Sequence, residues 1–376
     1  WEQRKLGDVA DIVGGGTPST NNPNYWDGDI DWYAPAEIAG QIYFDSSQRK
    51  ITEQGYENSS AKMLPPGTVL FTSRAGIGKT AILSKKGCTN QGFQSIVPYN
   101  DELDSYFVFS RTDELKQYGE LVGAGSTFVE VSGKQMAAMN LKMPTTIEEQ
   151  QTIGRFFKRL DTLITLHQRK YEKLVNIKKS MLDKMFPKNG ASVPEIRFKG
   201  FTDPWEQRKL GEIAKEVVRN DPASDAPIMM ITAGNGFIEQ SDRYAFNNAG
   251  ESLKKYILLE RGELAYNHGA SKLRPYGSCF ALTTVEKARI PFVYHCFSVE
   301  KSNPEFLSIE LNGANVENQL RKIVSSGARM DGLLNIAYSE YTEVTVQLPK
   351  KEEQDWIAKF FKHLDTLITL HQRKCD

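Results

Sequence analysis

The stretch FFKRLDTLITLHQRK at residues 156–170 recurs at 360–374 with a single substitution. The heptapeptide WEQRKLG at 1–7 recurs unchanged at 205–211, so that both repeats have the same offset of 204 residues. A constant offset is the sequence signature of a duplicated structural unit. We call these blocks the repeated frame, and they divide the chain into two halves of one design.

Two variable segments lie between the blocks of the repeated frame. They cover residues 8–147 and 212–351, are 140 residues long each, and share only faint similarity. The chain length of 376 residues suits two or three ordinary domains. The sequence therefore predicts two domains of equal size, held by constant segments and different in content.

The longer block of the repeated frame has the pattern of an amphipathic helix. Apolar side chains recur at steps of three and four residues from Glu148 onward, which places them on one stripe of a helix. Pro187, Gly190 and Pro194 then stop the helix. The side chains expected to pack between the two copies, or against a partner, are Phe157, Leu160, Ile164, His167, Phe361, Leu364, Ile368 and His371.

So long an apolar stripe needs a partner, and the second copy of the same helix is the obvious one. If a pseudo-twofold axis relates the two halves, the two helices pair antiparallel. The alternative is that each helix packs only on its own domain.

We therefore expect an α+β protein with two mixed α/β domains, separated by a pair of long antiparallel helices and related by a pseudo-twofold repeat. The expected parts are a first domain (1–147), a first conserved helix (148–187), a linker (188–204), a second domain (205–351) and a second conserved helix (352–376).

Each variable segment contains a strand–loop–strand unit with small residues and a basic residue at the tip. The first unit covers residues 67–83 and the second covers 262–282. Glycines allow the backbone to approach a ligand closely, and Arg, Lys, Asn and Gln side chains can bond base edges bidentately. Duplex DNA has a locally twofold backbone with a base sequence that need not repeat, which suits two unlike domains in a repeated frame.

The charge pattern is uneven although the formal net charge is zero. Residues 8–45 contain seven acidic residues and no Lys or Arg, whereas 49–95 has a net charge of +5 and 155–188 a net charge of +7. A DNA-binding protein usually has a basic bias, so the neutral total counts against DNA binding. The basic segments could meet a polyanion locally, or they could simply be solvated faces.

Several other chemistries have weak support. The segment 76–80, GIGKT, resembles the end of a phosphate-binding loop, but Ser73 stands where that motif needs a glycine. The five histidines have no metal-ligand spacing, and no nucleophile–base set is recognisable. The four cysteines are scattered without a C-x-x-C motif, which fits the reducing cytoplasm. We expect no metal site and no catalytic residue.

The motifs and their order resemble the specificity subunit of type I restriction–modification systems. The resemblance covers nearly the whole chain and rests on the repeated frame and on a series of short motifs. These are WEQRKLG, Gly15–Ser19, Trp26–Trp32, Thr72–Arg74, Gly78-Lys79, Asn90–Gln94, Tyr266–Gly269, Gly327–Gly332 and the Glu-Glu-Gln helix starts that follow Pro144 and Pro349.

The resemblance implies a non-catalytic chain that reads a split, asymmetric site in double-stranded DNA, one half per domain. Two methyltransferase subunits would dock on the conserved helices and carry S-adenosylmethionine, so that this chain binds no cofactor. Restriction subunits with motor activity could join them. The helix pair would set the spacing between the two half-sites, and its second helix looks shortened beside the first. The DNA-contacting residues expected on this basis are Ser73, Arg74, Lys79, Gln91, Gln94, Asn267, His268, Lys272, Arg274 and Arg329.

Two other functions remain open at this point. A coiled-coil scaffold that binds proteins without DNA specificity would also explain the repeat. A nuclease with a scattered active site is the enzymatic alternative.

Overall fold

The computed structural model describes residues 1–38, 40–74, 76–124, 130–188, 190–243, 250–324 and 334–374. The chain divides into two compact units, Trp1–Leu166 and His167–Asp376. The division falls inside helix α5 (Ile147–Lys184), the longest helix of the described chain. Among the described residues, no helix is long and apolar enough to cross a membrane.

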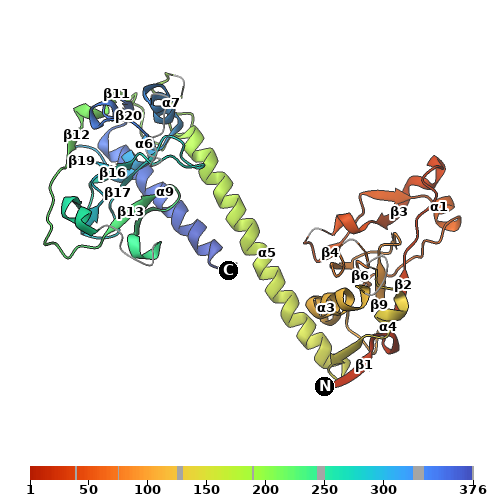
Figure 1. The fold of residues 1–376 in the computed structure, drawn as a ribbon. Coiled ribbons are helices and arrows are strands. Elements are labelled where there is room, and N and C mark those ends of the chain that lie inside the picture. The colour runs from red at the N-terminus through yellow and green to blue at the C-terminus, as the bar shows by residue number, and fades with distance from the viewer. Residues whose placement is uncertain are drawn as a thin grey trace. The chain divides into compact units, whose positions relative to one another are not determined.

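The first unit is built around a five-stranded sheet in the order β2-β9-β6-β7-β4 (Figure 1). The strands of this sheet are β2 (Ala10–Gly14), β4 (Tyr43–Phe44), β6 (Val69–Phe71), β7 (Thr80–Leu83) and β9 (Gln94–Pro98). Three short helices pack with it, namely α2 (Ser105–Ser110), α3 (Thr112–Gly123) and α4 (Gly133–Ala137). The buried centre includes Phe71, Ile96 and Leu115, none of which has exposed surface.

A small lobe extends from this sheet. It contains β3 (Trp26–Tyr33), β5 (Arg49–Ile51), β8 (Cys88–Thr89) and helix α1 (Glu53–Glu57). Its own core gathers Trp26, Trp32 and Ile51, and the two indole rings meet edge to face at 5.1 Å. The tryptophans of the Trp26–Trp32 motif thus hold the lobe together.

The second unit repeats the central sheet of the first. Its order β12-β19-β16-β17 matches β2-β9-β6-β7, with the same antiparallel neighbours. The strands are β12 (Ala214–Glu216), β16 (Leu264–Asn267), β17 (Ser278–Ala281) and β19 (His295–Val299). Further elements are β13 (Met229–Thr232), β14 (Gly236–Glu239), β15 (Ile257–Glu260), β18 (Lys287–Ile290), α6 (Pro304–Leu311), α7 (Ala314–Ile323) and α8 (Tyr338–Tyr341).

Each unit joins the two ends of its variable segment in a two-stranded sheet. Strand β1 (Glu2–Lys5) pairs antiparallel with β10 (Asn140–Met143), and β11 (Glu206–Lys209) pairs in the same way with β20 (Thr345–Leu348). The next helix, α5 or α9 (Lys351–Gln372), follows directly. The repeated frame therefore closes each unit on itself.

A glutamine contact is also repeated at the start of each long helix. The side-chain oxygen of Gln150 accepts the Asp104 N–H at 3.1 Å, and that of Gln354 accepts the Asn303 N–H at 2.8 Å. The donors, Asp104 and Asn303, are the N-cap residues of helices α2 and α6. The common fold of the two units thus extends to equivalent hydrogen bonds.

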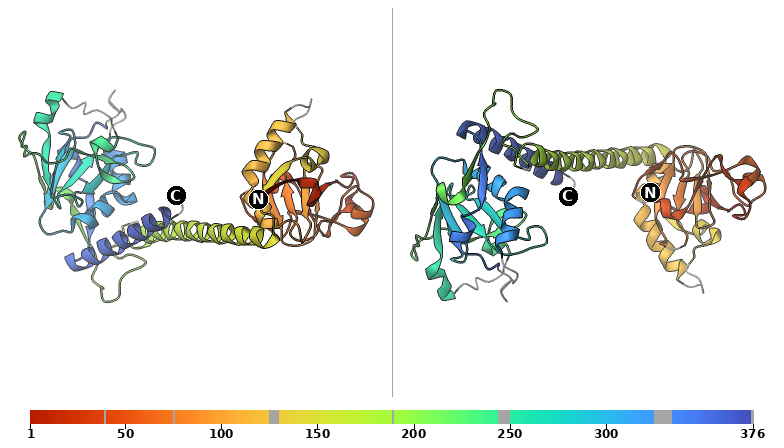
Figure 2. Two further views of the ribbon diagram at one scale, coloured as in Figure 1. Left: turned by 90° about the horizontal axis from the view of Figure 1, so that it is seen from below. Right: turned by 90° about the horizontal axis from the view of Figure 1, so that it is seen from above.

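Within the second unit, α9 packs antiparallel against the C-terminal half of α5 (Figure 2). His167 and His371 are 204 positions apart and meet with their Nδ1 atoms 2.9 Å from each other. Further along, Lys178 pairs with Asp365 at 2.5 Å. Residue numbers that rise on one helix meet numbers that fall on the other, which confirms the antiparallel pairing. The contact between the two helices begins at His167 and His371.

The predicted packing residues fall into two groups. Phe361, Leu364 and His371 are buried and Ile368 is half-buried, in agreement with the expected seam. By contrast, Phe157, Leu160 and Ile164 belong to the first unit and are 41%, 39% and 39% exposed. These three lie N-terminal to His167, where the observed pairing begins. Their packing between the helices, or against a partner, stays a prediction.

Candidate nucleic-acid interface

In the first unit, Ser73 joins three loops at the end of β6. Its N–H donates to the Gly92 carbonyl at 2.8 Å, and its own carbonyl accepts the Val131 N–H at 3.0 Å. The side chain is fully buried, and its hydroxyl has no hydrogen-bond partner among the described residues. The sequence predicted Ser73 as a DNA-contacting residue, and that contact stays a prediction. Ser73 lies beneath the surface and supports the loops around it.

Two basic side chains are exposed next to Ser73. Arg74 forms an ion pair with Glu130 at 2.7 Å, in which both side chains remain partly accessible. Lys79 donates its backbone N–H to the Thr72 hydroxyl at 2.9 Å, and its ammonium group has no partner in the described part of the chain. A surface ion pair contributes little to stability, about 0–1 kcal/mol, so both cations are available to an anionic ligand.

The two predicted glutamines lie beside the glycine loop 14–16. Gln91 is exposed, and its side-chain oxygen accepts a hydrogen bond from the Thr17 hydroxyl. Gln94 is half-buried. A Cβ atom added to Gly14 would lie 3.6 Å from the Gln94 Oε1 atom, and one added to Gly133 would lie 3.2 Å from it. The absence of side chains at these glycines leaves the Gln94 amide accessible.

Sequence reasoning overlooked the segment that brings Gly133 to this surface. Ser132 and Gln135 form a capping box at the start of α4, in which each side chain bonds the other's backbone N–H. This box positions the exposed Lys134 at the first turn of the helix. The pattern Ser-x-x-Gln was visible in the sequence and could have identified it.

The loop that resembles a phosphate-binding motif is a packing turn. Gly76 and Gly78 have positive φ angles of 100° and 94°, and a side chain at Gly78 would lie 2.3 Å from Lys116 of α3. The buried Ile77 between them packs against the same helix, facing Gly119. Strand β7 follows at Thr80, so the loop does not lead into a helix as a phosphate-binding loop does.

In the second unit, His268 occupies the place of Ser73. Its carbonyl accepts the Leu334 N–H at 2.9 Å, as the Ser73 carbonyl accepts that of Val131. The ring is buried and bridges two backbone carbonyls, with Nδ1 at 2.8 Å from Leu334 O and Nε2 at 2.7 Å from Val293 O. The sequence predicted that His268 lies in a loop and contacts DNA, and that contact stays a prediction for this buried ring. The imidazole connects the strand end to two neighbouring segments.

Asn267 and Arg274 are engaged inside the second unit. The Asn267 amide donates to Ile231 O at 3.0 Å and accepts the Gly269 N–H at 2.9 Å. The Arg274 guanidinium donates to Asn312 O at 2.6 Å, and burial lowers its pKa. Lys272 is exposed. Arg329 lies outside the described residues.

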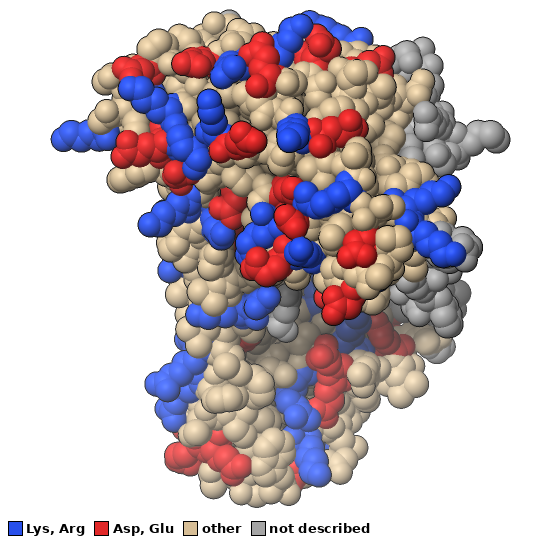
Figure 3. Space-filling model, turned by 90° about the vertical axis from the view of Figure 1, so that its left-hand side faces the viewer, with Lys and Arg blue, Asp and Glu red and all other residues tan. Residues whose placement is uncertain are grey.

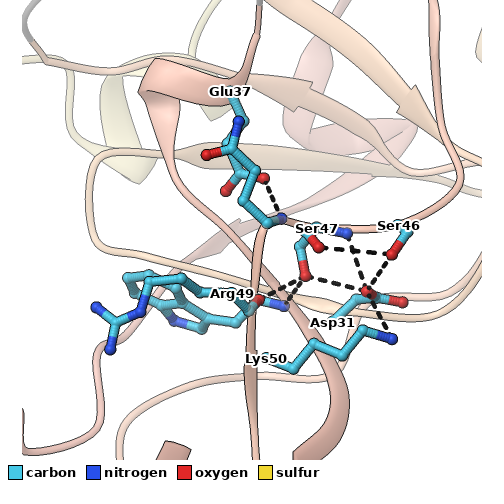
Figure 4. Close-up of polar contacts among 8 residues, drawn as sticks. Asp31, Glu37, Ser46, Ser47, Arg49 and Lys50 are labelled. Atoms are coloured by element: carbon cyan, nitrogen blue, oxygen red, sulfur yellow. Dashed lines mark hydrogen bonds and ion pairs between the residues drawn. The ribbon is translucent and has the colours of Figure 1, made fainter. Parts of the chain in front are cut away.

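The small lobe of the first unit holds its own basic residues in place (Figure 4). The Asp31 carboxylate accepts the Ser47 N–H at 2.9 Å and lies 3.4 Å from the Lys50 ammonium. Burial acts to raise the pKa of Asp31, but the Ser47 backbone and hydroxyl groups and Lys50 outweigh it and lower this pKa. Arg49 lies flat on Trp26, with its guanidinium carbon 3.8 Å from the ring centroid. Both cations are thus occupied within the lobe.

The remaining lysines of the basic segment 49–95 are free. Lys62, Lys85 and Lys86 are exposed and form no ion pair within the described ranges. They flank the bridge between Leu64 and Gly87, so they gather at one end of the β6–β7 hairpin, while Lys79 lies at the other end. Four lysines of this unit can therefore meet phosphate groups.

On the second unit, charges of both signs are mixed (Figure 3). Many cations are paired, for example Arg219 with Glu263 at 2.5 Å and Arg261 with Glu286 at 2.7 Å. No group of three or more metal-binding side chains occurs among the described residues. The surface thus has no strong field of one sign, and local cations must supply any contact with a polyanion.

Residues 1–176 match the family model described as "Type I restriction modification DNA specificity domain". Residues 1–176 of this chain are thus similar to that domain family. The resemblance found in the sequence is thereby confirmed for the first unit and the beginning of the second.

Characterised relatives are specificity subunits of type I restriction enzymes. The MjaIX specificity subunit of Methanocaldococcus jannaschii is 34% identical over 224 residues, which cover 57% of this chain and 52% of that protein. The EcoR124I/EcoR124II specificity subunit of Escherichia coli is 27% identical over 190 residues, which cover 46% of each chain. The matched region thus spans about half the length of these relatives.

A solved structure supports the fold over the whole chain. The type I restriction–modification system S subunit from M. genitalium aligns with a TM-score of 0.59 at 12% identity, over 100% of this chain and 92% of that one. At so low an identity the match concerns the fold alone. It confirms the predicted architecture of mixed α/β domains with long helices.

Proposed function

We propose that this chain is a DNA-recognition subunit of a type I restriction–modification complex, in which each unit reads one half of a split, asymmetric site in double-stranded DNA. The observation that carries the proposal is the repeated sheet order in two units whose surfaces differ. Equivalent backbone bonds at Ser73 and His268 support it, because they hold the loops of each unit in the same arrangement. The family match of residues 1–176 points to the same function.

The chain acts without catalysis of its own in this proposal. Two methyltransferase subunits dock on α5 and α9 and carry S-adenosylmethionine, and restriction subunits with motor activity join them in the cytoplasm. The helix pair sets the distance between the two half-sites. Because the variable segment 8–147 has 11 basic against 16 acidic residues, the isolated chain binds DNA weakly, and the methyltransferases supply the remaining phosphate contacts.

The exposed predicted residues are the DNA contacts we propose, namely Arg74, Lys79, Gln91, Gln94 and Lys272. Ser73, Asn267, His268 and Arg274 support these surfaces from beneath. Replacement of a base-reading arginine should cost about 1–3 kcal/mol at one position of the site, whereas loss of a phosphate-binding lysine weakens all sequences evenly. An unchanged melting temperature separates loss of contact from loss of folding.

The decisive experiment exchanges one variable segment. Residues 8–147 are replaced by the equivalent segment of a relative, and methylated sites are mapped in cells that also express the methyltransferase. We expect one half of the recognised sequence to change, and the matched exchange of 212–351 to change the other half. A change of both halves by either exchange would rule out separate readers. Methylation that follows neither exchange would leave a protein-binding scaffold as the function.

A further inference from the structure

Gln94 of the first unit and His295 of the second occupy the same position in the repeated sheet. Each is the first residue of its strand, β9 or β19. The third residue of each of these strands pairs with the first residue of the neighbouring strand, β6 or β16. The surroundings of the two side chains can therefore be compared directly.

Gly133 and Tyr338, the first residues of α4 and α8, are also equivalent. Leu6 and Leu210 belong to the identical heptapeptides of the repeated frame. Each of these leucines donates its N–H at 2.8 Å to the carbonyl six residues beyond Gly133 or Tyr338, in Met139 or Val344. The two short helices thus start at the same place, one with a glycine and the other with a tyrosine.

In the second unit, Tyr338 covers His295. The two rings meet edge to face at 5.9 Å, and the His268 ring stacks on His295 at 5.1 Å. The Nε2 atom of His295 lies 3.0 Å from the carbonyl oxygen of Ile336. The imidazole is therefore engaged by its own unit on several sides.

In the first unit, Gly133 leaves Gln94 uncovered. A Cβ atom at Gly133 would lie 3.2 Å from Oε1 of Gln94, so a larger residue there would meet the amide group. Gln94 is half-buried, its side chain makes no hydrogen bond within the described ranges, and its amide does not belong to the buried polar groups that lack a partner. The amide is open to solvent and keeps both donors and an acceptor for a ligand.

The backbone does not require a glycine at position 133. This residue is not one of the glycines with a positive φ angle, and it lies within a helix, where alanine is more favourable than glycine. The nearest atoms to an added Cβ belong to the flexible end of Gln94 and, at 3.7 Å, to Ile12. The advantage that glycine does offer at this position is access to Gln94.

We propose that residue 133 is a specificity-determining position of the first unit, because its glycine allows the Gln94 amide to bond the edge of an adenine base in the major groove. A glutamine amide fits adenine in two places, since N7 of the base accepts a hydrogen bond and the N6 amino group donates one. Tyr338 closes the same route in the second unit, so His295 reads no base. This role of residue 133 rests on the proposed function and names one base that the first unit reads.

The test uses the full chain in complex with its methyltransferase and a set of DNA duplexes in which each base pair of the mapped recognition sequence is changed in turn. Methyl transfer is measured for the parent, Gln94→Ala, Gly133→Tyr and the double variant. Both single variants should lose about tenfold discrimination at the same A·T pair of one half-site, because each removes the same two-point contact. The double variant should lose no more than either single variant, and discrimination at the other half-site should not change.

Two further variants separate access from folding. Ala138→Tyr places the same phenol at the exposed C-terminal end of α4 and should leave discrimination unchanged, as the matched control. Gly133→Ala adds only the Cβ atom, so it should melt no lower than the parent and still weaken discrimination at the same base pair. It carries the test if Gly133→Tyr does not fold.

Three results would overturn the role of residue 133 while the two-reader function stands. These are full discrimination in the position-133 variants, losses at different base pairs in Gly133→Tyr and Gln94→Ala, and an even loss of methylation on every duplex in Gly133→Tyr. A parent complex that methylates all duplexes equally would overturn the proposed function and the role of residue 133 together.

Discussion

Ser73 in the first unit and His268 in the second occupy the same place in the sheet with different chemistry. In both cases the backbone carbonyl accepts an N–H from the segment that precedes α4 or α8. The hydroxyl of Ser73 has no described partner, whereas the ring of His268 bridges two carbonyls. The comparison teaches that backbone bonds preserve the common fold, while the side chains inside it are free to differ between the units.

The largest difference in stability between the two units is expected when an equivalent phenylalanine is truncated in each. Phe361→Ala should destabilise the second unit by about 4 kcal/mol, because it empties a buried aromatic site. Phe157→Ala should cost less than about 1 kcal/mol, because this ring is already largely solvated. Denaturant unfolding followed by hydrogen exchange of each unit provides the measurement. Equal losses in the two units would mean that Phe157 is covered in solution.

The equivalent glutamates should differ in the same direction. Glu353→Ala leaves Arg197, its partner at 2.7 Å, buried without a carboxylate and should cost about 3 kcal/mol. Glu149→Ala removes an exposed group and should cost less than about 0.5 kcal/mol. The same unfolding experiment reports both values. Restoration of stability by a second change, Arg197→Met, would identify the unpaired charge as the cause, and a failure to restore it would point to lost packing instead.

Stability should also respond to pH differently in the two units. Burial raises the pKa of Glu310, in the second unit, to about 7. The native state therefore retains a proton that the unfolded state loses above its ordinary pKa of 4.5. Stability from this group is full below 4.5 and is lost as the pH rises to about 7, by up to about 3 kcal/mol. The pKa of Asp31 in the first unit is lowered, so its contribution is lost only as the pH falls below 3.8.

Glu310→Gln isolates this effect from other titrating groups. The variant should show a flatter pH profile between 4.5 and 7 than the parent and greater relative stability at the upper end. Thermal melts of the two proteins at matched pH values provide the comparison. A constant difference between the two profiles across this range would contradict the raised pKa.

The smallest effects are expected at His268 and Ser73. His268→Ala leaves two buried carbonyls without their partner and should cost about 2 kcal/mol. Ser73→Ala removes a buried hydroxyl that bonds nothing among the described residues and should change stability by less than about 0.5 kcal/mol in either direction. Both variants retain the backbone bond at this position. A large loss in Ser73→Ala would show that its hydroxyl has a partner in solution.

The sequence predicted the features that depend on repetition and periodicity. Helix α5 runs from Ile147 to Lys184, close to the expected 148–187, because its apolar stripe is long and a proline follows it. The antiparallel pairing followed from the constant offset of 204 residues. The periodicity of a helix is a local property and the repeat is a symmetry of the chain. Both can therefore be recognised in a single sequence.

Burial at the candidate site could not be predicted in the same way. The residues from Val69 to Ser73 are all buried, so the strand end lacks the alternation that separates inward from outward side chains. The sequence therefore gave no sign that Ser73 lies beneath Arg74. Likewise, Phe157 and Phe361 belong to matching sequences, and only the segment that covers the second copy makes them differ. Exposure depends on neighbours that are distant in the chain.

The pairing of β1 with β10 has a consequence for how such proteins diversify. Lys5 lies opposite Asn140, so a variable segment enters and leaves its unit at adjacent points. Genetic recombination between stretches of coding sequence for the repeated frame would replace everything between these points and leave the closing strands intact. The incoming segment would meet the same register at both ends. A lineage could thus acquire a new recognition surface in a single crossover event, without a series of destabilising intermediates.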